Sequence, residues 1–154
     1  MRFFGGHVKV GLENFPLIRC YAKTLIELSK HDRKSCVSDA SHFLEMMKSN
    51  EDMRFFFCSL SSSKKDCLVA IEAIRDQFSS LFIKFLLILN ENRRLYILVE
   101  ILGLFLSFAK KDAGEIDIEV VSAMPMKESD EKFILELLEP SFGKVVSMEK
   151  FIDP

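Results

Sequence analysis

The segment 79–95 reads Ser-Ser-Leu-Phe-Ile-Lys-Phe-Leu-Leu-Ile-Leu-Asn-Glu-Asn-Arg-Arg-Leu, and between Leu81 and Leu89 only Lys84 is not apolar. A helix on the surface of a globular protein has an apolar stripe and a polar face. This segment, read as a helix, has apolar side chains nearly all round. We therefore expect a helix that is buried in a bundle, embedded in lipid, or in contact with a second protein.

The composition restricts the class of protein. The chain has 154 residues, 49% of them hydrophobic and 29% charged, which suits a packed domain or a domain with a small annex. The formal net charge of -2 provides no basic field, so we expect no nucleic-acid partner. The four cysteines form no CxxC pair, and we interpret them as reduced, mostly buried thiols in a cytosol-like compartment.

A membrane span is not expected either. The apolar run 95–109 contains Glu100 and is shorter than the roughly 20 residues that cross a bilayer. Residues 1–14 lack the long apolar core and the small-residue cleavage pattern of a secretory signal. We interpret the first segment as a core helix and the second as a lead-in.

Apolar residues at helical spacing extend along most of the chain and predict six helices with short connections. Asn14, Asn50 and the serines 61–63 are placed to cap three of these helices. The predicted helices run from Pro16 to about Lys30, from Asp32 through Met47, from Asn50 through Phe57, from the serines 61–63 through Phe78, over the segment quoted above, and from Arg93 to about Lys111.

The pattern changes after Gly114. Residues 115–120 alternate strictly between polar and apolar, which is typical of a half-buried strand. Residues 127–139 predict a short helix that Pro140 and Gly143 stop, and residues 144–152 predict a second strand. The expected fold is mainly α. It has a lead-in over 1–14, an N-terminal six-helix bundle over 15–112, and a small α/β (strand-helix-strand) C-terminal unit over 113–154.

The residues needed for catalysis do not come together in the sequence. No glycine pattern matches a phosphate-binding loop, and the histidines at 7, 31 and 42 are far apart. The acidic residues at 115, 117 and 119 share one face of a strand, and we interpret them as a solvated face. We therefore predict no catalytic, cofactor-binding or metal-binding residues, no cofactor, and no enzymatic activity.

Four stretches resemble a known family. Residues 21–30, Tyr-Ala-Lys-Thr-Leu-Ile-Glu-Leu-Ser-Lys, resemble its opening YAxALfelA helix, and residues 85–95 resemble its fnFLlLLaENgRL segment. Residues 121–126 are similar to its vtSAvPL junction and residues 151–154 to its kvDP. The matches keep their order and spacing from Pro16 to Pro154. The chain is thereby identified as a member of the ATP synthase delta subunit family, which is related to the mitochondrial oligomycin-sensitivity-conferring protein.

The resemblance implies a non-catalytic peripheral-stalk (stator) subunit of the F-type proton-translocating ATP synthase, at the cytoplasmic face of the inner cell membrane. In the family the bundle grips the N-terminal helix of an alpha subunit with its first and fifth helices, and the C-terminal part meets the b-subunit stalk. The residues expected to bind the alpha helix are Tyr21, Leu25, Leu28, Ile83, Leu87 and Ile88. The family continues past this Asp-Pro pair, so we expect either an incomplete C-terminal unit or a chain that is a cut version of a longer product.

The pattern of the fifth helix is compatible with such a partner. Phe82, Phe85, Leu86 and Leu89 lie at bundle spacing, which leaves positions 83, 87 and 88 partly on another side. Alternatively, all these side chains pack in the core of the bundle. Two other functions are also compatible with the sequence. One is a stand-alone helical adaptor that binds some other amphipathic partner helix, and the other is a bundle with a Phe-lined cavity for a small molecule.

Overall fold

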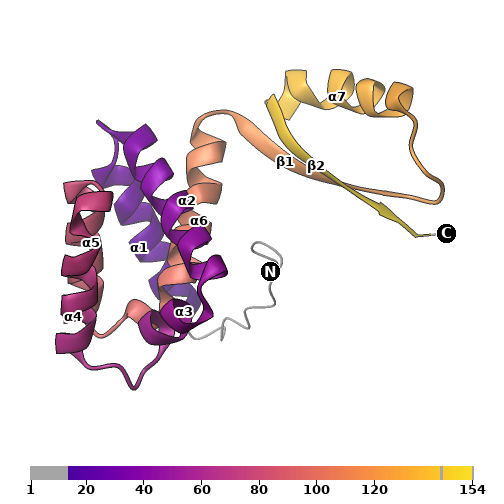
Figure 1. Ribbon diagram of the computed structural model, residues 1–154. Coiled ribbons are helices and arrows are strands. Elements are labelled where there is room, and N and C mark those ends of the chain that lie inside the picture. The colour runs from indigo at the N-terminus through magenta and orange to yellow at the C-terminus, as the bar shows by residue number, and fades with distance from the viewer. Residues whose placement is uncertain (1–13, 143, 154) are drawn as a thin grey trace. The chain divides into compact units, whose positions relative to one another are not determined.

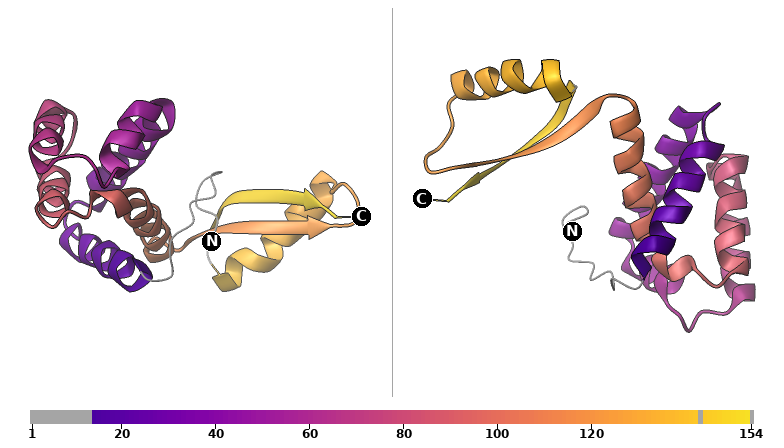
Figure 2. Two further views of the ribbon diagram at one scale, coloured as in Figure 1. Left: turned by 90° about the horizontal axis from the view of Figure 1, so that it is seen from below. Right: turned by 180° about the vertical axis from the view of Figure 1, so that it is seen from behind.

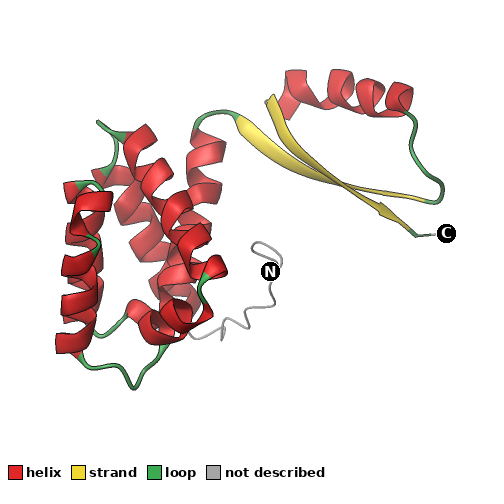
Figure 3. Ribbon diagram, viewed as in Figure 1, coloured by secondary structure: helices red, strands yellow, loops and turns green. Residues whose placement is uncertain are grey.

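A computed structural model gives the fold and describes residues 14–142 and 144–153. In these ranges six helices precede a strand, a seventh helix and a second strand (Figures 1 and 3). Their bounds are α1 Phe15–Leu28, α2 Arg33–Ser49, α3 Glu51–Cys58, α4 Lys64–Ala73, α5 Ser80–Glu91, α6 Leu98–Asp112, β1 Glu115–Ser122, α7 Glu128–Phe142 and β2 Lys144–Ile152. The mainly α fold class is confirmed. The expected lead-in, apart from Asn14, lies outside the described residues.

Two of the predicted helix caps are confirmed and one is wrong. Asn50 Oδ1 accepts a hydrogen bond from the Met53 amide at 3.0 Å, and Ser63 Oγ accepts one from the Asp66 amide at 3.1 Å. These bonds satisfy amides of the first turn that have no partner within the helix. Asn14 precedes α1 but its side chain makes no capping hydrogen bond.

The bundle core contains a cluster of aromatic rings. Phe43 of α2 lies with its ring centroid 5.6 Å from that of Phe57 in α3, 5.8 Å from Phe78 and 5.7 Å from Phe82 in α5. Phe43 and Phe82 are completely buried. Elements that are far apart in sequence are thus joined through one residue, as expected for a single continuous core.

Two predicted helix boundaries are wrong. The sixth helix begins at Leu98 and not at Arg93, because Arg93 has a left-handed φ of 55° and a short 3-10 turn, η3 Leu95–Ile97, follows it. The fourth helix ends at Ala73, before a second 3-10 turn, η2 Arg75–Gln77. Phe78 is then extended and stacks on Phe82 with ring centroids 5.2 Å apart. Burial of the Phe78 ring in the core therefore replaces continuation of the helix.

The chain divides into two compact units between Ala109 and Lys110, in the last turn of α6. In the second unit β1 and β2 pair in parallel, with Ile118 opposite Met148, and α7 makes the connection that parallel strands require (Figure 1). The predicted second strand is confirmed. The helix before it does not stop at Pro140 but continues to Phe142. A proline this close to the end removes one hydrogen bond from the last turn only.

Candidate partner-binding surface

Tyr21 joins the first and fifth helices. Its ring packs edge-on against the Phe85 ring of α5, with centroids 6.2 Å apart and planes at 76°. Arg94 donates a hydrogen bond from Nη1 to Tyr21 Oη at 2.7 Å and holds its guanidinium over the same ring. In Figure 2 (right) α1 lies between α5 and α6. The two helices that the family resemblance pairs are therefore neighbours.

One stripe of α1 is accessible beside this junction. Leu17 and Tyr21 are half-buried and Leu28 is 55% exposed, and these positions share one face of the helix. Leu25 is completely buried on the core side, with Ala22. The prediction for Leu25 is corrected accordingly, because a side chain enclosed by its own bundle has no surface to offer a partner.

On α5 the accessible residue beside α1 is Ile88, which is 50% exposed. It lies three residues after Phe85, the ring that meets α1, so both side chains are on the same edge of the helix. Leu81, four residues before Phe85, is half-buried on that edge too. Ile83 is only 3% exposed and belongs to the core. Its predicted contact with a partner is therefore corrected as well.

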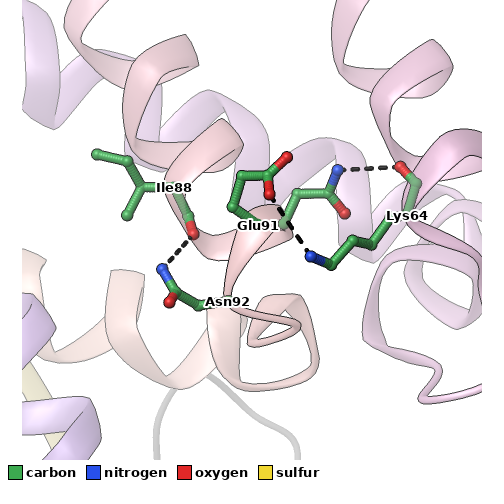
Figure 4. A network of polar contacts seen from close by, with 5 residues as sticks. Lys64, Ile88, Glu91 and Asn92 are labelled. Atoms are coloured by element: carbon green, nitrogen blue, oxygen red, sulfur yellow. Dashed lines mark hydrogen bonds and ion pairs between the residues drawn. The ribbon is translucent and has the colours of Figure 1, made fainter.

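Leu87 is half-buried but occupies the other edge of α5. It lies three residues before Asn90, whose Nδ2 donates a hydrogen bond to the Lys64 carbonyl of α4 at 3.0 Å. Beside that bond, Lys64 Nζ lies 3.5 Å from Glu91 Oε2, and Asn92 Nδ2 donates to the Ile88 carbonyl at 2.8 Å (Figure 4). Leu87 thus faces the α4 side, where polar contacts fix the end of α5.

The accessible apolar residues of the two helices form what we name the α1–α5 surface: Leu17, Tyr21, Leu28, Leu81 and Ile88. Three of these five residues, Tyr21, Leu28 and Ile88, were predicted from the sequence. Leu17 and Leu81 were missed, although each stands at helical spacing from a residue that was found, four before Tyr21 and seven before Ile88. An exposed apolar surface of this kind is suited to binding the apolar face of a partner helix.

Two of the cysteines, Cys36 and Cys58, are unsuited to chemistry. Burial raises the pKa of Cys36 to about 12, with Asp39 adding to the effect, and burial and Glu100 raise that of Cys58 to about 11. Both are neutral thiols at physiological pH and hence poor nucleophiles and metal ligands. The prediction of mostly buried thiols holds for Cys36 and Cys67, which are buried, and not for Cys20, which is exposed.

Within residues 14–142 and 144–153, no three His, Cys, Asp or Glu side chains gather in a way that could hold a metal ion. In the same ranges no helix has the length and hydropathy needed to cross a membrane.

Comparisons with known proteins agree with this picture. The family model described as the ATP synthase delta (OSCP) subunit matches residues 17–154. The ATP synthase subunit delta of Ehrlichia chaffeensis is 32% identical over 135 residues, which are 88% of this chain and 72% of that protein. That of Rhizobium johnstonii is 33% identical over 138 residues, 87% of this chain and 73% of that protein.

A solved structure has the same fold. One chain in the mitochondrial ATP synthase hexamer of Toxoplasma gondii superposes with a TM-score of 0.64 at 22% identity, over 89% of this chain and 77% of that chain. At this level of identity the match supports the arrangement of helices and strands.

The fold and the accessible apolar surface are those of a binding subunit built on a helical bundle. The chain belongs to the ATP synthase delta (OSCP) subunit family, because the family model covers it from residue 17 to residue 154 and relatives are identical at about a third of the aligned positions. It is accordingly a peripheral-stalk subunit of an F-type ATP synthase, a membrane-associated complex. The family resemblance, the stator role and the absence of a catalytic role are confirmed.

Proposed function

We propose that the α1–α5 surface binds the N-terminal helix of an ATP synthase alpha subunit, and that the C-terminal unit contacts the b-subunit stalk at the cytoplasmic face of the membrane. The observation that carries the proposal is the adjacency of two accessible apolar stripes, one on α1 and one on α5, at the Tyr21–Phe85 contact. A stator has to resist torque, which requires stable binding and no turnover.

The dimensions of the surface suit a short amphipathic helix. Leu17 and Leu28 are eleven residues apart, which corresponds to about 16 Å or three turns along α1. A partner helix of the same length can place residues i, i+4, i+7 and i+11 between the two stripes. Lys84 is exposed on α5 and Thr24 on α1, so polar side chains border the apolar residues as in other protein interfaces.

The C-terminal unit supports a second contact because it buries little by itself. From Lys110 onward, none of the side chains whose burial is described is fully buried. On α7, Phe133 is 65% exposed and Leu137 is 62% exposed, and the two are four residues apart on one face. Two strands and one helix are marginally stable alone, so a partner that covers this face, here the b-subunit, would supply the missing burial.

The alpha-subunit contact is tested by placing a charge on each stripe. Ile88→Asp and Leu28→Asp should each weaken binding of a synthetic alpha N-terminal peptide by about tenfold or more, because an unpaired carboxylate would be desolvated in the interface. Isothermal titration calorimetry on the full chain measures the affinity. Val69→Asp is the matched control, because Val69 is 70% exposed on α4 and lies off this surface.

Leu87→Asp distinguishes the two edges of α5. If the peptide lies along α1, this variant should keep an affinity within about threefold of the wild type, since Leu87 faces the α4 side. Wild-type affinity in both Ile88→Asp and Leu28→Asp, with circular dichroism showing folded protein, would refute the proposed surface. A loss confined to Leu87→Asp would instead move the site to the α4 side.

A further inference from the structure

The end of α5 has an arginine where a glycine is expected. The Arg94 amide donates to the Leu89 carbonyl at 2.8 Å and the Arg93 amide to the Asn90 carbonyl at 3.0 Å. This pair of bonds is the Schellman motif, whose left-handed position is usually glycine. Arg93 occupies that position with a φ of 55°.

Arg93 is the one non-glycine residue with positive φ in the described part of the chain. Its side chain is exposed and makes no hydrogen bond or ion pair with another described residue. The two backbone hydrogen bonds of the motif hold the turn, but the Arg93 side chain adds no contact inside the bundle that would offset the strain of its backbone. A side chain that replaces glycine in a sparsely populated conformation, and makes no contact within the fold, points to a role outside it.

The Arg93 side chain lines a pocket of about 210 Å³ on the α4 side of α5. The pocket's apolar side is formed by the buried Phe57 and Leu95. Its polar side carries Asn90, which is only 5% exposed, and Lys64. The volume is enough for one large aliphatic side chain.

The loop between α3 and α4 forms one wall of this pocket and is held in place by hydrogen bonds. Ser62 Oγ donates to the Phe56 carbonyl at 2.7 Å, and the hydroxyls of Ser59 and Ser61 are 2.6 Å apart. Leu60, at the tip of the loop, lines the pocket but is 78% exposed. An ordered loop that keeps a leucine in solvent beside a pocket extends the apolar area available to a partner.

The charges around the pocket favour an acidic ligand. Lys64 and Arg93 line it, and Glu91 is the carboxylate that approaches Lys64, at 3.5 Å and with a largely exposed side chain. Arg93 is thus a cation whose planar guanidinium is available for a bidentate bond to a carboxylate.

We propose that this pocket is a second docking site, which takes an aliphatic side chain from an acidic segment of a partner protein while Arg93 pairs with a neighbouring carboxylate. The site lies on the α4 side of α5 and shares no residue with the α1–α5 surface. It does not depend on the alpha-subunit contact proposed above.

The test is a titration of the isotope-labelled full chain with two short peptides, acetyl-Glu-Leu-Leu-Glu-amide and acetyl-Lys-Leu-Leu-Lys-amide, followed by amide NMR shifts. The acidic peptide should give saturable shifts at Leu60, Arg93 and Leu95, with an affinity at least about fivefold higher than that of the basic peptide. Equal affinities would overturn the proposal, as would saturable shifts found only on the α1–α5 surface. Identical shifts with sodium acetate would overturn it too, because they would show binding of an anion alone.

Three variants of Arg93 separate charge from backbone strain. Arg93→Gln removes the charge but keeps a side chain at positive φ, so the acidic peptide should bind at least about threefold more weakly at unchanged thermal stability. Arg93→Lys keeps the charge and should bind within about twofold. Arg93→Gly should bind as weakly as Arg93→Gln while Tm rises by a few degrees, roughly 4 °C, because glycine relieves the strain. Retained affinity in both Arg93→Gln and Arg93→Gly would refute the role of Arg93.

Discussion

Tyr21 has both a structural and a surface role, and the two have to be separated in experiments. Its hydroxyl accepts a hydrogen bond from Arg94 and its ring packs on Phe85, so it fixes the spacing of α1 and α5. The remaining ring surface is half-exposed in the α1–α5 surface. A Tyr21 variant would disturb both roles, and Ile88 and Leu28 are the cleaner positions at which to probe partner binding.

Glu100 on α6 is a second residue whose environment has a measurable consequence. Its Oε2 is buried and has no hydrogen-bond partner among the described residues, and burial raises the pKa of this carboxyl above its ordinary value. A group whose pKa is raised by folding favours the folded state when protonated. Its contribution is complete below the unfolded-state pKa and is lost as the pH rises through the folded-state pKa.

Glu100→Gln should therefore stabilise the protein at pH 7 more than at pH 4. Glutamine keeps the shape of the side chain and removes the cost of burying a charge. Urea unfolding of wild type and variant at the two pH values gives the difference between their free energies of unfolding. The contributions of other titrating groups largely cancel in this difference. Glu45→Gln, at an exposed position of α2, is the matched control and should show no such trend. A pH-independent difference for Glu100→Gln would contradict this account.

At the scale of single helices, the two asparagines that precede α3 and α1 form a natural comparison. Asn50 caps α3 through Met53, whereas Asn14 makes no side-chain hydrogen bond to α1. Pro16 lies in the first turn of α1 and brings no amide hydrogen that would need a partner. The first turn of α1 thus has one donor fewer to satisfy.

Asn50→Ala should accordingly cost about 1 kcal/mol of unfolding free energy, while Asn14→Ala should change it by less than about 0.5 kcal/mol. Chemical denaturation monitored by circular dichroism measures both. The same chemical change is made twice, so a difference between the variants isolates the capping bond. Equal costs would show that the Asn50 contact adds nothing to the stability of α3.

Across the whole molecule, the stability of the bundle depends on a cluster that no single helix contains. Phe43 contacts rings from α3, from the segment before α5, and from α5 itself. The second unit has no comparable cluster among its described side chains. With this division, the bundle is stable by itself, whereas the proposed partner would cover the exposed apolar side chains of the smaller unit.

Phe43→Ala should lower the unfolding free energy by about 3–5 kcal/mol, because it leaves a cavity between several elements. Phe55→Ala provides the control, since Phe55 is 73% exposed on α3 and its removal should cost less than about 0.5 kcal/mol. Urea unfolding of the two variants measures the difference. A cost below about 1 kcal/mol for Phe43→Ala would mean that the neighbouring rings collapse into the space, and the central role of Phe43 would be refuted.

Much of the fold follows from local physics that can be read along the chain. The apolar spacing of the six helices, the Asn50 and Ser63 caps, and the alternation that forms β1 depend on neighbours within about four residues. The resemblance of residues 21–30 and 85–95 to family segments added the pairing of the first and fifth helices. The helices, the caps and the strand were predicted because periodicity and capping are properties of the sequence itself.

Tertiary structure alone decided which side chains remain accessible. Leu25 and Leu28, or Ile83 and Ile88, look equally apolar in sequence, but the first of each pair is buried and the second is at least half exposed. Whether a side chain is buried depends on how much of the helix circumference the neighbouring helices cover. The apolar periodicity of the sequence does not give that fraction. The inward rotation of Phe78 has the same origin. Its ring contacts with Phe43 and Phe82 outweigh the local preference for continuing a helix.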